Sequence, residues 1–106
     1  MIDRLRDRVH VKQSQIHGRG LFAARPIGDV THIGTYKGPR SETNHDHVLW
    51  YEEDDGSVVG IAGRNILRYV NHSKTPNAQF YGPELYALQP IGTGDEITAD
   101  YGEDWN

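Results

Sequence analysis

The apolar segments of this chain are all short, and a turn signal follows almost every one of them. Several segments alternate between apolar and polar residues as strands do, and no long stretch keeps the period of a helix. The turn signals combine glycine with proline or aspartate, as in Lys37-Gly38-Pro39, Asp54-Asp55-Gly56 and Tyr81-Gly82-Pro83. Many short strands separated by regular turns predict a mainly β domain.

The expected strands are distributed along the whole chain, with room for no more than a helical turn in residues 63–70. They cover residues 9–12, 20–24, 29–36, 48–51, 57–61, 84–88 and 96–101. A chain of 106 residues has room for one domain of this kind. We therefore expect a single domain over residues 1–106, without linkers.

One short sequence occurs twice, as Pro26-Ile27-Gly28 and Pro90-Ile91-Gly92. Each copy precedes an expected strand that finishes on a tyrosine, Tyr36 in the first case and Tyr101 in the second. An ordinary turn used twice explains the repeat equally well, so both interpretations stay open.

The composition excludes several classes of protein. The chain has no cysteine, which excludes disulfides, cysteine-bound zinc and a thiol nucleophile, and suits a reducing compartment. A net charge of −4 argues against non-specific binding of nucleic acid and favours a basic partner. No apolar run approaches the ~20 residues that span a bilayer. We expect a cytoplasmic protein, or a nuclear one in a eukaryote, with no direct nucleic-acid or membrane partner.

Three segments have the composition of a binding site. Residues 16–21 contain Gly18 and Gly20, which let a backbone approach a ligand closely. Residues 68–77 place polar side chains in a partly apolar stretch, where they need partners when buried. Residues 95–102 combine carboxylates with a tyrosine. Taken singly, these segments also fit a tight turn, an Asx-rich loop and a strand with an acidic turn.

Together the three segments resemble the SET-domain family of protein lysine methyltransferases. The matching motifs, in order, are Gly18-Arg19-Gly20, Tyr36-Lys37-Gly38, an Arg-aromatic-x-Asn-His-Ser…Pro-Asn motif in residues 68–77, and Glu-hydrophobic-Thr-x-Asp-Tyr in residues 96–101. The resemblance implies small curved β-sheets, with a knot-like C-terminal segment that threads under the Asn-His-Ser segment. It also implies S-adenosylmethionine as cofactor, S-adenosylhomocysteine as product, and a protein lysine as substrate.

The resemblance further implies a cofactor site. The backbone of Gly18, Arg19 and Gly20 would hold the amino-acid end of the cofactor. Asn71 and His72 would bind the cofactor through the side-chain amide and the backbone. Trp105 would pack against the adenine, and its alternative role is to pack the C-terminus onto the core.

By the same resemblance, Tyr101 is the catalytic tyrosine and Tyr36 a second tyrosine at the lysine channel. Phenol hydroxyls there would orient a neutral amine in line with the methyl carbon, so that positioning contributes most of the rate. A desolvated channel beside a sulfonium charge would lower the pKa of the lysine from ~10.4. Phe80 and Ala99 are expected at substrate-binding positions that set the number of methyl groups. Because neither has a hydroxyl, we expect more than one methyl group per lysine.

The chain departs from typical family members, which carry zinc-binding cysteines after Asn-His-Ser and in flanking segments. Here position 74 is lysine. We expect no zinc-binding flanking segments and no metal. A second protomer or the substrate itself would then close the lysine channel, so a homodimer is also expected.

Acidic side chains gather in residues 52–55 and again in residues 95–104. They form either solvated turns or a negative field that steers a basic, lysine-containing protein, for example a histone-like tail, into the groove.

Two other functions stay open. His45 and His47 resemble the first metal motif of cupins, because His-x-His on a strand puts both imidazoles on one face, although no second motif follows. The other function is a SET-like module that binds a peptide without turnover. The presence of Tyr101 and of Asn71-His72 argues against this module.

Overall fold

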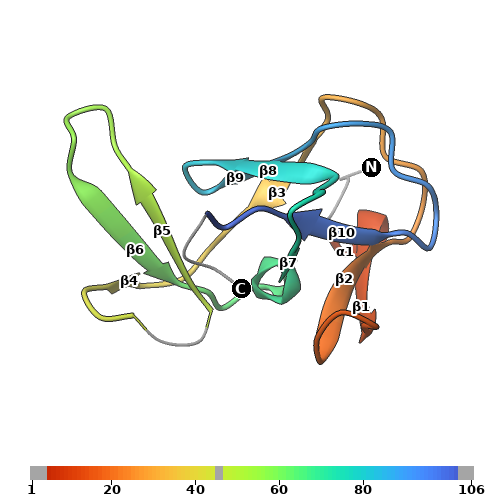
Figure 1. Ribbon diagram of the computed structural model, residues 1–106, viewed down its shortest axis with the longest axis horizontal. Coiled ribbons are helices and arrows are strands. Elements are labelled where there is room, and N and C mark those ends of the chain that lie inside the picture. Colours follow the sequence, from red (N-terminus) through yellow and green to blue (C-terminus); the bar gives the residue numbers. More distant parts are fainter. Residues whose placement is uncertain (1–4, 45–46, 103–106) are drawn as a thin grey trace.

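The computed structural model of the protein describes residues 5–44 and 47–102. Within these ranges the chain is built almost entirely of short strands, so the expected mainly β class is confirmed (Figure 1). The elements are α1 (Leu5–Arg8), β1 (Val9–Gln13), β2 (Arg19–Ala23), β3 (His32–Thr35), β4 (Arg40–Ser41), β5 (Val48–Glu52), β6 (Val58–Ala62), the 3₁₀ helix η1 (Ile66–Tyr69), β7 (Asn71–His72), β8 (Ala78–Tyr81), β9 (Glu84–Ala87) and β10 (Glu96–Ala99).

The larger sheet places the C-terminal strand in its middle. Its order is β1-β2-β10-β8-β9-β3, and β7 pairs with β10 beside this path. Strand β10 runs antiparallel to β2 and parallel to β7, with Thr98 opposite Asn71 and Ala99 opposite His72. The C-terminal motif therefore lies directly against the Asn-His-Ser segment, although the two are far apart in the sequence.

The smaller sheet, in the order β4-β6-β5, forms a separate lobe at the left of Figure 1. Its edge strand β5 pairs with β6, and Trp50 lies opposite Gly60. A methyl group at Gly60 would come within 2.7 Å of both the Trp50 ring and the Ser41 carbonyl oxygen. Glycine at this position therefore allows the indole to lie flat across the hairpin.

The two Pro-Ile-Gly turns pair with each other. The N–H of Ile27 donates to the carbonyl of Ile91, and the N–H of Ile91 donates to the carbonyl of Ile27, both at 2.9 Å. Both isoleucine side chains are buried. The repeat thus joins the turn before β3 to the turn before β10.

The core joins buried side chains of the larger sheet, of η1 and of β5. Burying each aliphatic side chain there stabilises the fold by about 1.5–3 kcal/mol. Its largest fully buried side chains are Val9, Leu21, Ile33, Leu67, Leu85, Ile91 and Ile97. The helical turn expected within residues 63–70 is confirmed as η1, which buries Ile66 and Leu67.

Several elements differ from the sequence-based expectation. Residues 29–31 are not a strand, because Val30 lies in a turn with φ +60° and its side chain is exposed. Strand β10 ends at Ala99 and not at Tyr101, since the Asp100 carboxylate accepts the Gly102 N–H at 2.9 Å and turns the chain.

Strands β4, β7 and β8 and the helix α1 were not expected. Strand β8 exists because it pairs with β9 across the turn at Gly82 and with β10 on its other side. No helix in the ranges described is long and apolar enough to cross a membrane.

Candidate active site

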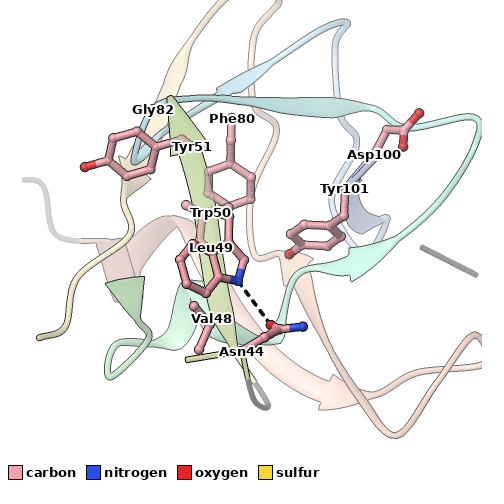
Figure 2. Close-up of a pocket in the computed structure, with 9 residues that line it drawn as sticks. All are labelled: Asn44, Val48, Leu49, Trp50, Tyr51, Phe80, Gly82, Asp100 and Tyr101. Carbon is pink, nitrogen blue, oxygen red and sulfur yellow. Dashed lines mark hydrogen bonds between the residues drawn. The ribbon is translucent and has the colours of Figure 1, made fainter. Parts of the chain in front are cut away.

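A pocket of about 220 Å³ lies where β5, the β8–β9 turn and the chain after β10 meet. Its lining residues are Asn44, Val48, Leu49, Trp50, Tyr51, Phe80, Gly82, Asp100 and Tyr101. Figure 2 shows Trp50 and Phe80 on one side of the pocket and Tyr101 on the other. The indole N–H of Trp50 donates to Asn44 Oδ1 at 3.1 Å, which fixes the ring.

Hydrogen bonds from both the side chain and the backbone of Tyr101 hold it against residues 70–72. Its hydroxyl donates to the Val70 carbonyl at 2.7 Å, and its backbone N–H donates to His72 Nδ1 at 3.0 Å. The Tyr101 and Phe80 ring centroids are 6.1 Å apart. Burial raises the pKa of Tyr101 well above its usual value, and the neighbouring Tyr36 raises it further. The phenol therefore stays protonated at neutral pH, where it is a hydrogen-bonding group and not a base.

Tyr36 is buried and packs against Phe80. The two ring centroids are 5.8 Å apart, and the rings meet edge to face. The Tyr36 hydroxyl donates to the His47 carbonyl. A methyl group at Gly63 would overlap the Tyr36 ring and hydroxyl, so glycine is needed there. Burial raises the pKa of Tyr36 to about 12, and the charge of Arg68 partly opposes this rise. Tyr36 thus supports a lining residue and does not itself line the pocket.

These two tyrosines predict a loss of stability in alkaline solution. In the unfolded chain they ionise near the ordinary pKa of 10.0, whereas the folded protein keeps Tyr36 protonated up to about pH 12. Above pH 10 the unfolded state binds fewer protons than the folded state, so the free energy of unfolding falls as the pH rises. We expect the urea midpoint to decrease between pH 10 and about 12, and to decrease less in Tyr36→Phe. An identical slope in the two proteins would contradict this account.

The glycine of the Tyr-x-Gly motif has a steric role. A methyl group at Gly38 would overlap the backbone carbonyl of Ala62, because residues 37–39 run against residues 62–64. The Arg64 N–H donates to the Lys37 carbonyl at 2.7 Å, and the Ala62 N–H donates to the Pro39 carbonyl at 2.9 Å. The motif therefore fixes the approach of the smaller lobe to η1.

A second group of expected residues meets at the β1–β2 turn. Asn71 Nδ2 donates to the carbonyls of His17 and Arg19, each at 3.1 Å, and to Glu96 Oε2 at 2.9 Å. Gly18 has φ +44°, and a methyl group on it would contact nothing within 4 Å. The structure thus brings the Gly18-Arg19-Gly20 turn and Asn71 together. It also shows that the amide nitrogen of Asn71 bonds to the turn itself.

The protein leaves no room for a side chain at position 20. A methyl group there would overlap the Glu96 carboxylate, so the space over Gly20 is already used by a side chain from β10. The open backbone of the turn is at Gly18.

Residues 70–72 connect the turn to the pocket. Asn71 bonds to the turn, whereas Val70 and His72 bond to Tyr101. Asn77 holds the facing strand, because its Nδ2 donates to the Glu96 carbonyl at 2.8 Å and its Oδ1 accepts the Thr98 N–H at 2.9 Å. Residues 70–72 therefore set the geometry of both the pocket and the β1–β2 turn.

Of the expected site residues in the described ranges, Tyr36, His72 and Ala99 are not among those that line the pocket, and the roles expected for them stay predictions. Ala99 is fully buried on β10, between His72 and Ala78, and its substrate-binding role stays a prediction. Trp105 lies outside the described residues, as does His45 of the His-x-His segment.

His47 takes part in packing. Its Nδ1 lies 3.0 Å from the Arg68 carbonyl oxygen, and its ring meets Tyr69 at 5.8 Å. Within residues 5–44 and 47–102, no group of three or more His, Cys, Asp or Glu side chains could hold a metal ion. The absence of a metal stays a prediction for the whole chain.

Sequence reasoning did not identify several residues that the structure places at these sites, among them Trp50, Asn44 and Ser14. Trp50 lies on β5 and Asn44 in the segment before it, and no local signal marks either as a pocket residue. Ser14 and Glu96 hold the turn. A signal for Glu96 was present, because it opens the motif that ends at Tyr101.

The fold and these two connected sites define a SET domain. Residues 18–102 match the model of the SET-domain family, and the chain belongs to that family.

The chain spans only a small part of the curated relatives that it matches. Histone-lysine N-methyltransferase trithorax of Drosophila virilis is 32% identical over 91% of this chain and 3% of that protein. Histone-lysine N-methyltransferase SETD1A of Homo sapiens is 30% identical over 84% of this chain and 6% of that protein. The methyltransferase domain of human PR domain-containing protein 2 superposes with a TM-score of 0.71 at 23% identity, over 94% of this chain and 81% of that chain. This superposition shows the fold.

Proposed function

We propose that this SET domain transfers methyl groups from S-adenosylmethionine to a lysine side chain of a protein. The observation that carries the proposal is the connection through residues 70–72. This segment fixes Tyr101 at an aromatic pocket and, one residue away, holds the Gly-x-Gly turn. Similar proteins named histone-lysine N-methyltransferases support the same reaction.

The residues at the turn fit the proposed cofactor. The left-handed Gly18 leaves open space over its backbone, and Asn71 fixes the carbonyls on either side of it. Backbone groups of the turn and of His72 would hold the amino-acid end of the cofactor, and Trp105 would meet the adenine. S-adenosylmethionine, which SET methyltransferases use, supplies a methyl carbon activated by a sulfonium.

In the proposed reaction, Tyr101 positions the lysine amine. Its hydroxyl proton is donated to the Val70 carbonyl, so its oxygen would accept a hydrogen bond from the amine. Trp50 and Phe80 surround the lysine side chain with apolar surface, which favours the neutral, nucleophilic amine over the ammonium form. The raised pKa of Tyr101 is consistent with an orienting role, and positioning then contributes most of the rate.

The proposed substrate is a basic protein such as a histone-like tail. Strand β5, which lines the pocket, continues directly into the exposed acidic residues 52–55, whose field would steer such a partner. We also propose a cytoplasmic or nuclear location and a homodimer in which a second protomer helps to close the lysine channel.

Calorimetric titration of the purified protein with S-adenosylmethionine and S-adenosylhomocysteine tests the proposal. We expect micromolar binding, followed by transfer of labelled methyl groups to a lysine-rich protein such as a histone. A folded protein that binds neither compound, even with the lysine-rich protein present, would instead favour the peptide-binding module without turnover.

The number of methyl groups depends on the room at Phe80. Phe80 has no hydroxyl to hold the amine or a water molecule, and it lies between Tyr36 and Tyr101. We expect mass spectrometry of the product to show more than one methyl group per lysine. Phe80→Tyr should shift the product toward monomethyl-lysine, because the added hydroxyl occupies the space of a second methyl group. A wild-type protein that yields only monomethyl-lysine would contradict this prediction.

A further inference from the structure

The carboxylate of Glu96 is the centre of a hydrogen-bond network behind the β1–β2 turn. Ser14 Oγ donates to the two carboxylate oxygens, at 2.8 and 2.9 Å, and Asn71 Nδ2 donates to Oε2 at 2.9 Å. Ser14 and Asn71 precede Glu96 by 82 and 25 positions in the sequence. We call these three side chains the Glu96 network.

Both partners of Glu96 bond onward to the turn. Ser14 Oγ accepts the N–H of Ile16 at 2.9 Å and that of His17 at 3.4 Å. Asn71 Nδ2 donates to the carbonyls of His17 and Arg19 at 3.1 Å. The amides on one side of the turn and the carbonyls on the other are therefore held by two groups that both bond to the same carboxylate.

Apart from the Glu96 network, the turn is held by backbone bonds: the Ser14 N–H donates to the Gly18 carbonyl at 2.8 Å, and Gln13 pairs with Arg19 at its base. The side chains of Ile16, His17 and Arg19 are exposed, so they add no packing against the core. Gly18 has the conformational freedom of a glycine in the left-handed region. The backbone geometry of the turn thus depends on hydrogen bonds, and the side chains that supply them, Ser14 and Asn71, both bond to Glu96.

Glu96 is itself well anchored for this task. Its carbonyl accepts Asn77 Nδ2 at 2.8 Å, and its backbone pairs with Phe22 on β2. Its carboxylate occupies the space over Gly20, where a methyl group would overlap it. A carboxylate suits the position because both of its oxygens accept and neither donates.

We propose that Glu96 is a positioning residue that fixes the Gly18-Arg19-Gly20 turn, through Ser14 and Asn71, in the conformation that binds the cofactor. The inference rests on the proposed function, because it assigns the turn to S-adenosylmethionine. Glu96 acts through the turn backbone and does not take part in methyl transfer. Its loss should therefore weaken cofactor binding and leave turnover at saturating cofactor nearly unchanged.

Glu96→Ala tests the inference, with Glu84→Ala as the matched control. Glu84 is also a partly buried carboxylate between strands, and it accepts Thr35 Oγ1 at 2.6 Å and bonds to His32 Nε2 at 2.8 Å, away from the turn. We expect Glu96→Ala to raise the Kd for S-adenosylhomocysteine and the KM for S-adenosylmethionine by about tenfold or more, with kcat within about threefold. Glu84→Ala should leave all three values unchanged at a temperature where both variants are folded.

Two milder variants keep the test decisive if Glu96→Ala does not fold. Ser14→Ala removes one arm of the network, and Glu96→Gln keeps one accepting oxygen. We expect each to raise the Kd less than Glu96→Ala would, in the range of about three- to tenfold. Wild-type affinity in both, or equal affinity in Glu96→Ala and Glu84→Ala, would overturn the inference.

Amide hydrogen exchange separates this inference from the proposed function. The N–H groups of Ile16 and His17 should exchange faster in Glu96→Ala than in wild-type protein, and at the wild-type rate in Glu84→Ala. If wild-type protein binds no cofactor but shows this pattern, the proposed function fails while the control of the turn by Glu96 holds. Unchanged exchange in Glu96→Ala would overturn the inference whatever the wild-type protein binds.

Discussion

Tyr101→Phe should reduce methyl transfer at least about 100-fold, because it removes the hydroxyl that orients the lysine amine. The ring stays, so the packing of Tyr101 against Phe80 is preserved. The change leaves the Val70 carbonyl without its 2.7 Å donor, which we expect to cost about 1–3 kcal/mol in the free energy of unfolding. Initial rates with labelled cofactor measure the first effect, and urea denaturation measures the second.

The binding of S-adenosylhomocysteine should change little in this variant, because the lost hydroxyl donates to the Val70 carbonyl, whereas the β1–β2 turn is held by Asn71. Tyr81→Phe is the matched control, since its side chain is exposed on β8 and does not line the pocket. It should turn over like the wild-type protein. If Tyr101→Phe were as active as Tyr81→Phe, the hydroxyl would have no role in the reaction and another group would have to position the amine.

Asn71→Asp should be the most damaging isosteric change at the turn. It replaces an N–H₂ group by an oxygen at a point where three acceptors converge: the carbonyls of His17 and Arg19 and the carboxylate of Glu96. No donor then remains among these groups, and two carboxylates face each other. We expect a loss of about 2–4 kcal/mol in the free energy of unfolding and a rise of about 100-fold or more in the Kd for S-adenosylhomocysteine.

Asn65→Asp is the matched control for this prediction. It makes the same chemical change at a single acceptor, because Asn65 Nδ2 donates to the Thr35 carbonyl at 2.7 Å. It should lose some stability and keep the cofactor affinity of the wild-type protein. Adding Glu96→Gln to Asn71→Asp restores one donor, so the double variant should be more stable than Asn71→Asp alone. Equal affinities in Asn71→Asp and Asn65→Asp would contradict the role given to Asn71.

Most of the strands could be predicted from the sequence because the information is local. Alternation and turn residues identify β1, β2, β5, β6 and β9 to within a residue or two. Strand β8 has no comparable signal, since its existence depends on its partners β9 and β10. Val30 would suit a strand by its residue type, yet it occupies a left-handed turn. Its N–H donates to the Ala87 carbonyl at 3.1 Å, which is a tertiary contact that local sequence does not reveal.

The candidate site, like the fold, could be predicted from the sequence only in part. The sequence by itself determined the family, because four motifs with fixed residue types follow one another in order along the chain. It also identified Tyr101 and the Gly18-Arg19-Gly20 turn as candidate site residues. Only the tertiary structure decided that Asn71 bonds to the turn backbone, that Trp50 lines the pocket and that Ala99 is fully buried. The physical reason is that hydrogen-bond partners and pocket walls come from strands that are distant in sequence: β10 pairs with β7 beside Asn71, and Trp50 comes from β5 of the smaller sheet.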